Sequence, residues 1–161
     1  MNEYISKSRN SNELGDLFNY YSKNSEKPEN NFFLAVDGEE IVGHVALDKW
    51  IYPGDAFEDA EFIQECDRVQ NTSLKMLEIR RMSVKSSYRG GGVATALLKH
   101  VFKYSKELEM DRIILKTSSL QVGARRLYSK LGFEILGVLR FGPPFSVFKF
   151  MIDTSKINIS K

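Results

Sequence analysis

The sequence predicts a single α/β domain over residues 1–161. Short apolar runs of strand length alternate with longer segments in which apolar residues recur at helical spacing. A glycine-rich junction joins one predicted strand directly to a helix, and no internal repeat or low-complexity tract interrupts the chain. The length suffices for one domain with a substantial core, and 42% apolar with 27% charged residues is ordinary for a globular protein.

The first half of the chain is predicted to hold a helix, a hairpin and a long strand. Residues 11–24 carry leucines and aromatic residues at helical spacing, behind an N-cap at Ser11 or Asn12. The apolar runs 32–36 and 41–47 are joined by Asp37-Gly38-Glu39-Glu40, which is a strong hairpin signal. Residues 74–84 are predicted to form a longer strand.

The second half is predicted to alternate helices with strands. Residues 92–108 form a helix with an apolar stripe, followed by a strand at 113–117. A helix at 121–131 and a strand at 133–139 come next. Gly142-Pro143-Pro144 then breaks the chain before a last strand at 145–152.

Bulk composition excludes several classes of function. The net charge of +2 is close to balance, so we expect no nucleic-acid partner. A single cysteine, Cys66, rules out an internal disulfide framework and favours a reducing, cytoplasmic location. No run approaches the roughly 18 apolar residues of a membrane span, and the first residues do not begin a signal peptide. No cluster of His, Cys and Asp has metal-ligand spacing, so no metal is expected.

The run Tyr88-Arg89-Gly90-Gly91-Gly92-Val93-Ala94 is the most informative local feature. Its glycines allow positive φ angles and close approach of a ligand, and unpaired N–H groups at the start of the following helix favour anions. The planar guanidinium of Arg89 suits phosphate oxygens. We therefore predict a pyrophosphate-binding loop. The alternative, a flexible turn, explains the glycines but neither the arginine nor the adjacent helix start.

Two common phosphate-binding loops do not fit this run. A Walker loop needs Lys-Ser or Lys-Thr after its glycines, and Val93-Ala94-Thr95 follows here. A dinucleotide fingerprint needs a third glycine at the position of Thr95.

The pattern Arg89-x-x-Gly92-x-Ala94 instead resembles the acyl-CoA signature of the GNAT superfamily of N-acetyltransferases, Arg/Gln-x-x-Gly-x-Gly/Ala. Glu78-Ile79-Arg80-Arg81-Met82-Ser83-Val84 resembles that family's fourth strand. Leu127-Tyr128-Ser129-Lys130-Leu131-Gly132-Phe133-Glu134 resembles its x-Tyr-x-x-x-Gly-Phe motif at the end of the last helix. Together these similarities extend from Phe32 to about Phe150.

The resemblance implies a GNAT-like fold, with a central mixed, mostly antiparallel sheet flanked by helices. Arg81-Met82-Ser83-Val84 followed by Arg-Gly-x-Gly is similar to camello-type acetyltransferases. The family's first strand precedes its first helix, and only Tyr4-Ile5 is available for it, so this strand is expected to be short or absent.

The resemblance also implies acetyl-CoA as co-substrate and indicates the residues that hold it. The glycine loop would bind the pyrophosphate. The preceding strand would pair with the pantetheine arm, and the N–H of Met82 or Ser83 would stabilise the oxyanion. Gln121 stands where relatives often carry an asparagine that contacts pantetheine. The expected binding residues are Met82, Ser83, Val84, Arg89, Gly90, Gly91, Gly92, Val93, Ala94, Thr95 and Gln121.

Two side chains are candidates for acid–base catalysis. Tyr128 matches the family tyrosine that protonates the CoA thiolate; the alternative is a core aromatic residue. Glu78 is the candidate base, acting through water. Strand alternation predicts that Glu78 shares a sheet face with Arg80, Met82 and Val84. Its alternative role is an ion pair with Arg80.

The expected function is transfer of an acetyl group from acetyl-CoA to a primary amine, on a small molecule, a peptide or a protein. Direct transfer in a ternary complex is preferred, because no activated cysteine or serine is visible for an acyl-enzyme. The acidic segment 55–67 either lines the acceptor site or is an ordinary surface helix. The alternative function is a non-catalytic acyl-CoA-binding or protein-interaction module. The sequence leaves open whether the protein is a monomer or a homodimer.

Overall fold

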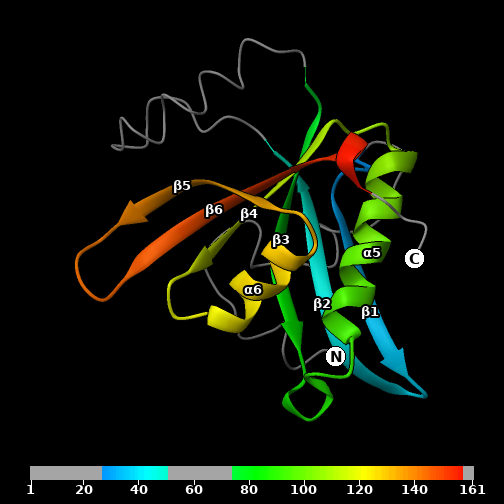
Figure 1. Cartoon of the computed structure of the whole chain (residues 1–161). Coiled ribbons are helices and arrows are strands. Elements are labelled where there is room, and N and C mark those ends of the chain that lie inside the picture. Colours follow the sequence, from blue (N-terminus) through cyan, green and yellow to red (C-terminus); the bar gives the residue numbers. More distant parts are fainter. Residues whose placement is uncertain (1–26, 51–73, 158–161) are drawn as a thin grey trace.

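The computed structural model describes residues 27–50 and 74–157, which form a six-stranded sheet in the order β1-β2-β3-β4-β6-β5 (Figure 1). The predicted elements in these ranges are confirmed, with ends shifted by no more than two residues. The predicted helix at 11–24, the Tyr4-Ile5 strand and the acidic segment 55–67 lie outside the described residues. The elements are β1 (Asn31–Asp37), β2 (Glu40–Lys49), β3 (Met76–Val84), η2 (Ser86–Tyr88), α5 (Val93–Glu107), β4 (Arg112–Ser118), α6 (Val122–Lys130), β5 (Glu134–Arg140), β6 (Ser146–Asp153) and η3 (Thr154–Lys156).

The sheet is mixed and mostly antiparallel, as the family resemblance implied. Strands β1 and β2 form the predicted hairpin, with Gly38 at φ 60° in its turn. Strand β3 pairs antiparallel with β2 but parallel with β4. Strand β6 lies between β4 and β5 and is antiparallel to both. Because parallel neighbours need a crossover, the chain between β3 and β4 passes through α5.

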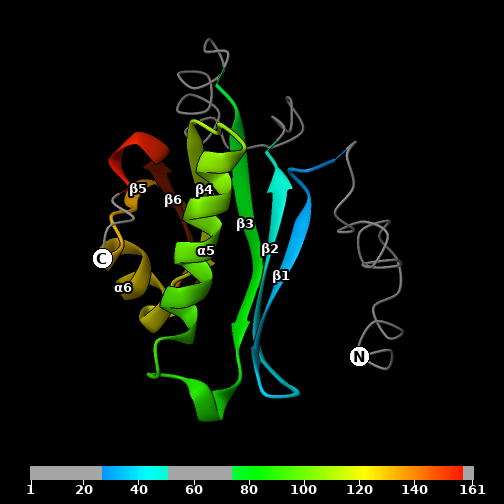
Figure 2. The same cartoon turned by 90° about the vertical axis from the view of Figure 1, so that its right-hand side faces the viewer.

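Helices α5 and α6 pack on one side of the sheet, which we call the helix face; Figure 2 shows α5 lying along β2 and β3. Alternate residues of the inner strands point to this face and form the main core with the apolar stripe of α5. Each fully buried leucine or isoleucine there stabilises the fold by roughly 1.5–3 kcal/mol. The strand residues of this core are Val45, Leu47, Leu77, Ile79, Ile113, Leu115, Phe150 and Ile152. The opposite side, the far face, carries a smaller cluster around Met76 and Ile114.

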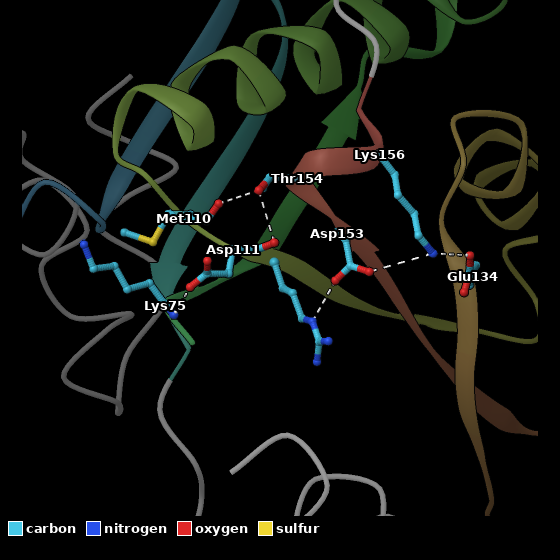
Figure 3. Close-up of polar contacts among 8 residues, drawn as sticks. Lys75, Met110, Asp111, Glu134, Asp153, Thr154 and Lys156 are labelled. Atoms are coloured by element: carbon cyan, nitrogen blue, oxygen red, sulfur yellow. Dashed lines mark hydrogen bonds and ion pairs between the residues drawn. The ribbon is translucent and has the colours of Figure 1, made fainter. Parts of the chain in front are cut away.

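Polar contacts fix the end of the sheet where β3 and β4 begin (Figure 3). The Asp111 carboxylate accepts the backbone N–H of Lys75 at 2.7 Å. The Thr154 hydroxyl contacts the carbonyl oxygens of Met110 and Asp111, which ties the end of β6 to the start of β4. Asp153 pairs with Arg112 at 2.7 Å on the adjacent strand. The starts of β3 and β4 are therefore held together at this end.

Gly43 determines how closely α5 approaches the opposite end of the sheet, where β2 begins and β3 ends. A Cβ atom on this residue would lie 3.0 Å from the Ser83 carbonyl oxygen and 3.2 Å from Val93 Cγ1. Any larger residue would push the first turn of α5 away from the end of β3. The glycine therefore allows the start of α5 to lie close to the end of β3.

Candidate active site

Strands β3 and β4 are paired over about the first half of their length and then diverge (Figure 1). Their parallel pairing runs from Met76–Arg112 to Ile79–Leu115, and within the described ranges it goes no further. Strand β4 nevertheless stays paired with β6 to Ser118, and β3 stays paired with β2 to Val84. On the β4 side, the backbone of β3 after Ile79 thus has no strand partner among the described residues. An extended ligand could form hydrogen bonds with it there.

A β-bulge at Arg81 lies at this divergence. Arg81 has φ 49°, an unusual conformation for a residue other than glycine. Arg80 pairs with Ala46 and Ser83 with His44, so two residues of β3 face the single residue between them on β2. The extra residue bends the strand and reverses its alternation from Met82 onward.

The bulge overturns one sequence prediction. Glu78 and Arg80 alternate with the core residues Leu77 and Ile79 and therefore point to the far face. Met82 and Val84 instead pack against the core on the helix face. The expectation that Glu78 shares a face with Met82 and Val84 is wrong, because the inserted residue shifts the two-residue period by one.

Tyr128 lies on α6, with its ring buried against Phe133 and Phe150 on the helix face. Its hydroxyl is 3.8 Å from Met82 Sδ, and a thioether is a weak hydrogen-bond acceptor. In the described part of the chain, this is the only hydrogen bond of that hydroxyl. Burial raises the pKa of Tyr128 above its usual value of 10.0, so the phenol stays protonated at neutral pH.

The way in which α6 ends explains the spacing of Tyr128, Gly132 and Phe133 in the Tyr-x-x-x-Gly-Phe motif. Gly132 has φ 93°, the left-handed conformation that ends many helices. The chain then turns back, and the backbone N–H of Phe133 donates to the Tyr128 carbonyl at 3.0 Å. The Tyr-x-x-x-Gly-Phe motif thus brings the phenylalanine ring against the tyrosine ring.

Glu78 is part of a charged region on the far face. Its carboxylate lies 3.6 Å from Lys116 Nζ, on the diverging strand β4. Two residues farther along β3, Arg80 pairs at 2.9 Å with the buried Asp48 of β2. Sequence analysis missed Lys116, because only the β3–β4 register brings it to Glu78. Glu78 and Tyr128 are therefore not brought together on one face.

The glycine loop forms the turn between η2 and α5. Gly90 (φ 82°) and Gly92 (φ 89°) are left-handed, and among the described residues no atom beyond their chain neighbours lies within 4 Å of where their Cβ atoms would be. The first N–H groups of any α-helix lack intrahelical partners, and Gly92, the N-cap of α5, has no side chain to accept a hydrogen bond from them. Arg89 Nε donates to the Val84 carbonyl at 3.1 Å, which folds this exposed side chain back over the end of β3. The open backbone, the unpaired donors and the arginine fit a pyrophosphate group.

Gln121 joins the end of β4 to the start of α6. Its side-chain oxygen accepts the Thr117 hydroxyl at 2.7 Å and the Ser118 backbone N–H at 3.4 Å. It therefore lies at the diverging end of β4. On the next turn of the helix, the Arg125 guanidinium donates to the Ser119 carbonyl and stacks 4.6 Å from the centre of the Phe148 ring.

The sequence profile of the acetyltransferase (GNAT) family matches residues 2–133, most of the chain. The chain belongs to this family. It is 31% identical over 127 residues to an N-acetylaspartate synthetase of Xenopus tropicalis, covering 79% of this chain and 38% of that protein. It is 40% identical over 107 residues to N-acetyltransferase 8F1 of Rattus norvegicus, covering 66% of this chain and 41% of the relative. These matches confirm the camello-type resemblance, although the chain spans less than half the length of either relative.

Solved structures share the fold. The ribosomal-protein-S18-alanine N-acetyltransferase of Escherichia coli superposes with a TM-score of 0.62 at 12% identity, over 92% of this chain and 81% of that one. A GNAT family acetyltransferase from Elizabethkingia anophelis with acetyl-CoA bound gives a TM-score of 0.59 at 19% identity, over 89% of this chain and 83% of that one. At these identities the similarity establishes the architecture. Within residues 27–50 and 74–157, no helix is both long enough and apolar enough to span a membrane.

Proposed function

We propose that this protein is an N-acetyltransferase that moves an acetyl group from acetyl-CoA to a primary amine by direct transfer in a ternary complex. The observation that carries the proposal is the buried, protonated Tyr128 hydroxyl next to Met82 at the β3–β4 divergence. A proton donor there would face the unpaired edge of a strand that leads into an anion-binding loop. Membership of the GNAT family supports acyl transfer.

Acetyl-CoA would bind along this edge. The pyrophosphate would meet Arg89, the loop Gly90-Gly91-Gly92, and the N–H groups of Val93, Ala94 and Thr95. The pantetheine arm would run alongside β3 and form hydrogen bonds with the backbone of Met82, Ser83 and Val84, where β4 no longer pairs with this strand. The side-chain amide of Gln121, at the end of β4, is available from the opposite side of the divergence. These are the residues that the family motifs indicate.

The chemistry follows from these positions. The amine nitrogen attacks the thioester carbonyl carbon, and the N–H of Met82 or Ser83 stabilises the oxyanion. The C–S bond then breaks, and the Tyr128 hydroxyl gives its proton to the leaving sulfur. Glu78 accepts the amine proton through water. Because Glu78 and Tyr128 lie on opposite faces, we infer that the acceptor approaches from the far face. No acyl-enzyme intermediate is required.

The acceptor class is open to a direct test. Thiol release from acetyl-CoA would be measured with polyamines, amino acids including aspartate, cysteine conjugates, and peptides with lysine or a free N-terminus. Aspartate is included because a relative is named for N-acetylaspartate. Amine-dependent release establishes the enzyme. Thermal stabilisation by CoA without turnover of any amine would instead favour the non-catalytic acyl-CoA-binding module.

A further inference from the structure

The acidic turn of the β1–β2 hairpin, residues 37–40, contacts the segment that leads into the glycine loop. The Tyr88 hydroxyl lies 3.2 Å from Asp37 Oδ2 and 3.0 Å from Glu40 Oε2. The other oxygen of Glu40 forms an ion pair with Lys85 Nζ. These contacts join parts of the chain that are 45 to 51 residues apart. Nothing in the proposed chemistry uses them.

The contacts hold both ends of η2. Lys85 directly precedes this turn, and Tyr88 is its last residue. The Lys85 backbone N–H donates to the Val42 carbonyl at 2.8 Å, so the hairpin also holds the main chain at this point. Gly90 follows only two residues after Tyr88. The glycines themselves impose little order on the loop, because their backbones are the least restricted.

We propose that Tyr88 and Glu40 are positioning residues that hold the glycine loop in its phosphate-binding conformation, so that affinity for CoA depends on the β1–β2 hairpin. This inference rests on the proposed function. A loop that is already ordered loses less conformational entropy when CoA binds, so the net free energy of CoA binding is more favourable. Loss of either anchor therefore weakens CoA binding, although neither residue need touch CoA.

A purely electrostatic role predicts the opposite. Carboxylates beside an anion site repel phosphates, so neutralising Glu40 would strengthen CoA binding and leave Lys85 available to attract it. Removing the Tyr88 hydroxyl changes no charge and would then have no effect. Glu39 separates the two roles. It lies in the same turn and, within the described residues, forms no side-chain hydrogen bond or ion pair.

The test measures CoA binding to the full chain by calorimetry, for the wild type and for Tyr88→Phe, Glu40→Gln and Glu39→Gln. We expect Tyr88→Phe and Glu40→Gln each to raise Kd by about three- to tenfold, which corresponds to the net contribution of about one ordinary hydrogen bond. Glu39→Gln should leave Kd within about twofold or lower it. In the double variant, which carries both Tyr88→Phe and Glu40→Gln, the increase in Kd should be smaller than the product of the two single increases, because the two residues are in contact.

Hydrogen exchange of residues 89–95 without CoA provides a second measurement. Faster exchange in Tyr88→Phe and Glu40→Gln, but not in Glu39→Gln, supports the anchoring role. Wild-type Kd in Tyr88→Phe, tighter binding in Glu40→Gln, or unchanged exchange in both would overturn it. If the wild type fails to bind CoA, the proposed function fails and this inference fails with it. If the wild type binds CoA and the variants behave like it, only this inference fails.

Discussion

The Tyr128 hydroxyl on α6 lies 3.8 Å from the Met82 sulfur on β3. Met82 reaches the helix face only because the bulge at Arg81 shifts the alternation of β3 just beyond the point where β4 leaves it. The same shift separates Tyr128 from Glu78, which stays on the far face with Lys116. The candidate acid and the candidate base therefore lie on opposite sides of the sheet.

Replacing Tyr128 with Phe should lower kcat by about a hundredfold, since general acids contribute roughly 10²- to 10⁴-fold. The affinity for acetyl-CoA should stay within about twofold. Stability should change by less than about 1 kcal/mol, because the lost partner is a thioether and the ring contacts remain.

The matched control is Tyr104→Phe, which removes another buried tyrosine hydroxyl. That hydroxyl donates to the Pro28 carbonyl at 2.6 Å and accepts from Asn31 at 3.1 Å. Tyr104→Phe should therefore lose about 1–2 kcal/mol of stability but keep its kcat. Steady-state kinetics and urea unfolding measure both effects, and an unchanged kcat in Tyr128→Phe would remove Tyr128 as the acid.

Replacing Glu78 with Gln distinguishes between two roles of this residue, as the general base or only as an ion-pair partner of Lys116. If Glu78 is the base, Glu78→Gln loses the acidic limb of the wild-type profile of kcat/KM against pH, along with roughly a hundredfold in rate. Lys116→Gln breaks the same 3.6 Å ion pair but should keep the acidic limb. The pH–rate profiles of both variants decide between the roles. An acidic limb that survives in Glu78→Gln excludes Glu78 as the base.

Two glycine replacements should act in opposite directions. Gly92→Ala places a side chain at φ 89°, which costs on the order of 1–2 kcal/mol and should weaken CoA binding. Gly123 lies within α6, and among the described residues no atom outside the helix backbone lies within 4 Å of the Cβ that Gly123→Ala adds, so this variant should gain roughly 0.5–1 kcal/mol of stability. Urea unfolding and calorimetry with CoA measure these changes. Wild-type CoA affinity in Gly92→Ala would mean that the loop geometry does not matter for binding.

His44 should make stability depend on pH. Burial, and secondly the charge of Arg81, lower its pKa below the usual 6.5. The unfolded chain therefore takes up the proton first as the pH falls, so the folded state loses stability from about pH 6.5 downward until His44 itself is protonated.

The check is the change in Tm between pH 7.5 and pH 5.5. His44→Gln should lose less stability on acidification than the wild type, because the buried titrating group is gone. His100→Gln, which replaces the only other histidine of the sequence at an exposed position on α5, should behave like the wild type. Equal losses in His44→Gln and the wild type would contradict the assignment.

Local patterns were enough to predict the described elements. Apolar periodicity placed the six described strands and the helices α5 and α6 within two residues, and Asp37-Gly38 indicated the first hairpin, whereas the short turns η2 and η3 were not predicted. The start of α5 at Val93 follows from the glycine run that ends at Gly92. These features depend on backbone preferences and on burial of one face, both of which neighbouring residues determine.

The site itself depends on relationships that local patterns do not contain. A left-handed arginine has no sequence signature, so the bulge at Arg81 and the resulting face of Met82 could not be predicted. The Glu78–Lys116 pair requires the β3–β4 register, and the contacts of Tyr88 require the hairpin turn to lie beside η2. The Tyr128–Met82 contact spans 46 residues and follows from packing alone.

Mass spectrometry of the protein incubated with acetyl-CoA, with and without an amine acceptor, tests the proposed transfer most directly. Direct transfer predicts that the protein mass stays unchanged in both mixtures, and that a product heavier by one acetyl group forms only when an amine is present. A protein that gains an acetyl group without amine, and passes it on when amine is added, would contradict direct transfer. If the protein binds CoA but acetylates no amine of any class in the panel, the result would contradict the proposed N-acetyltransferase activity itself.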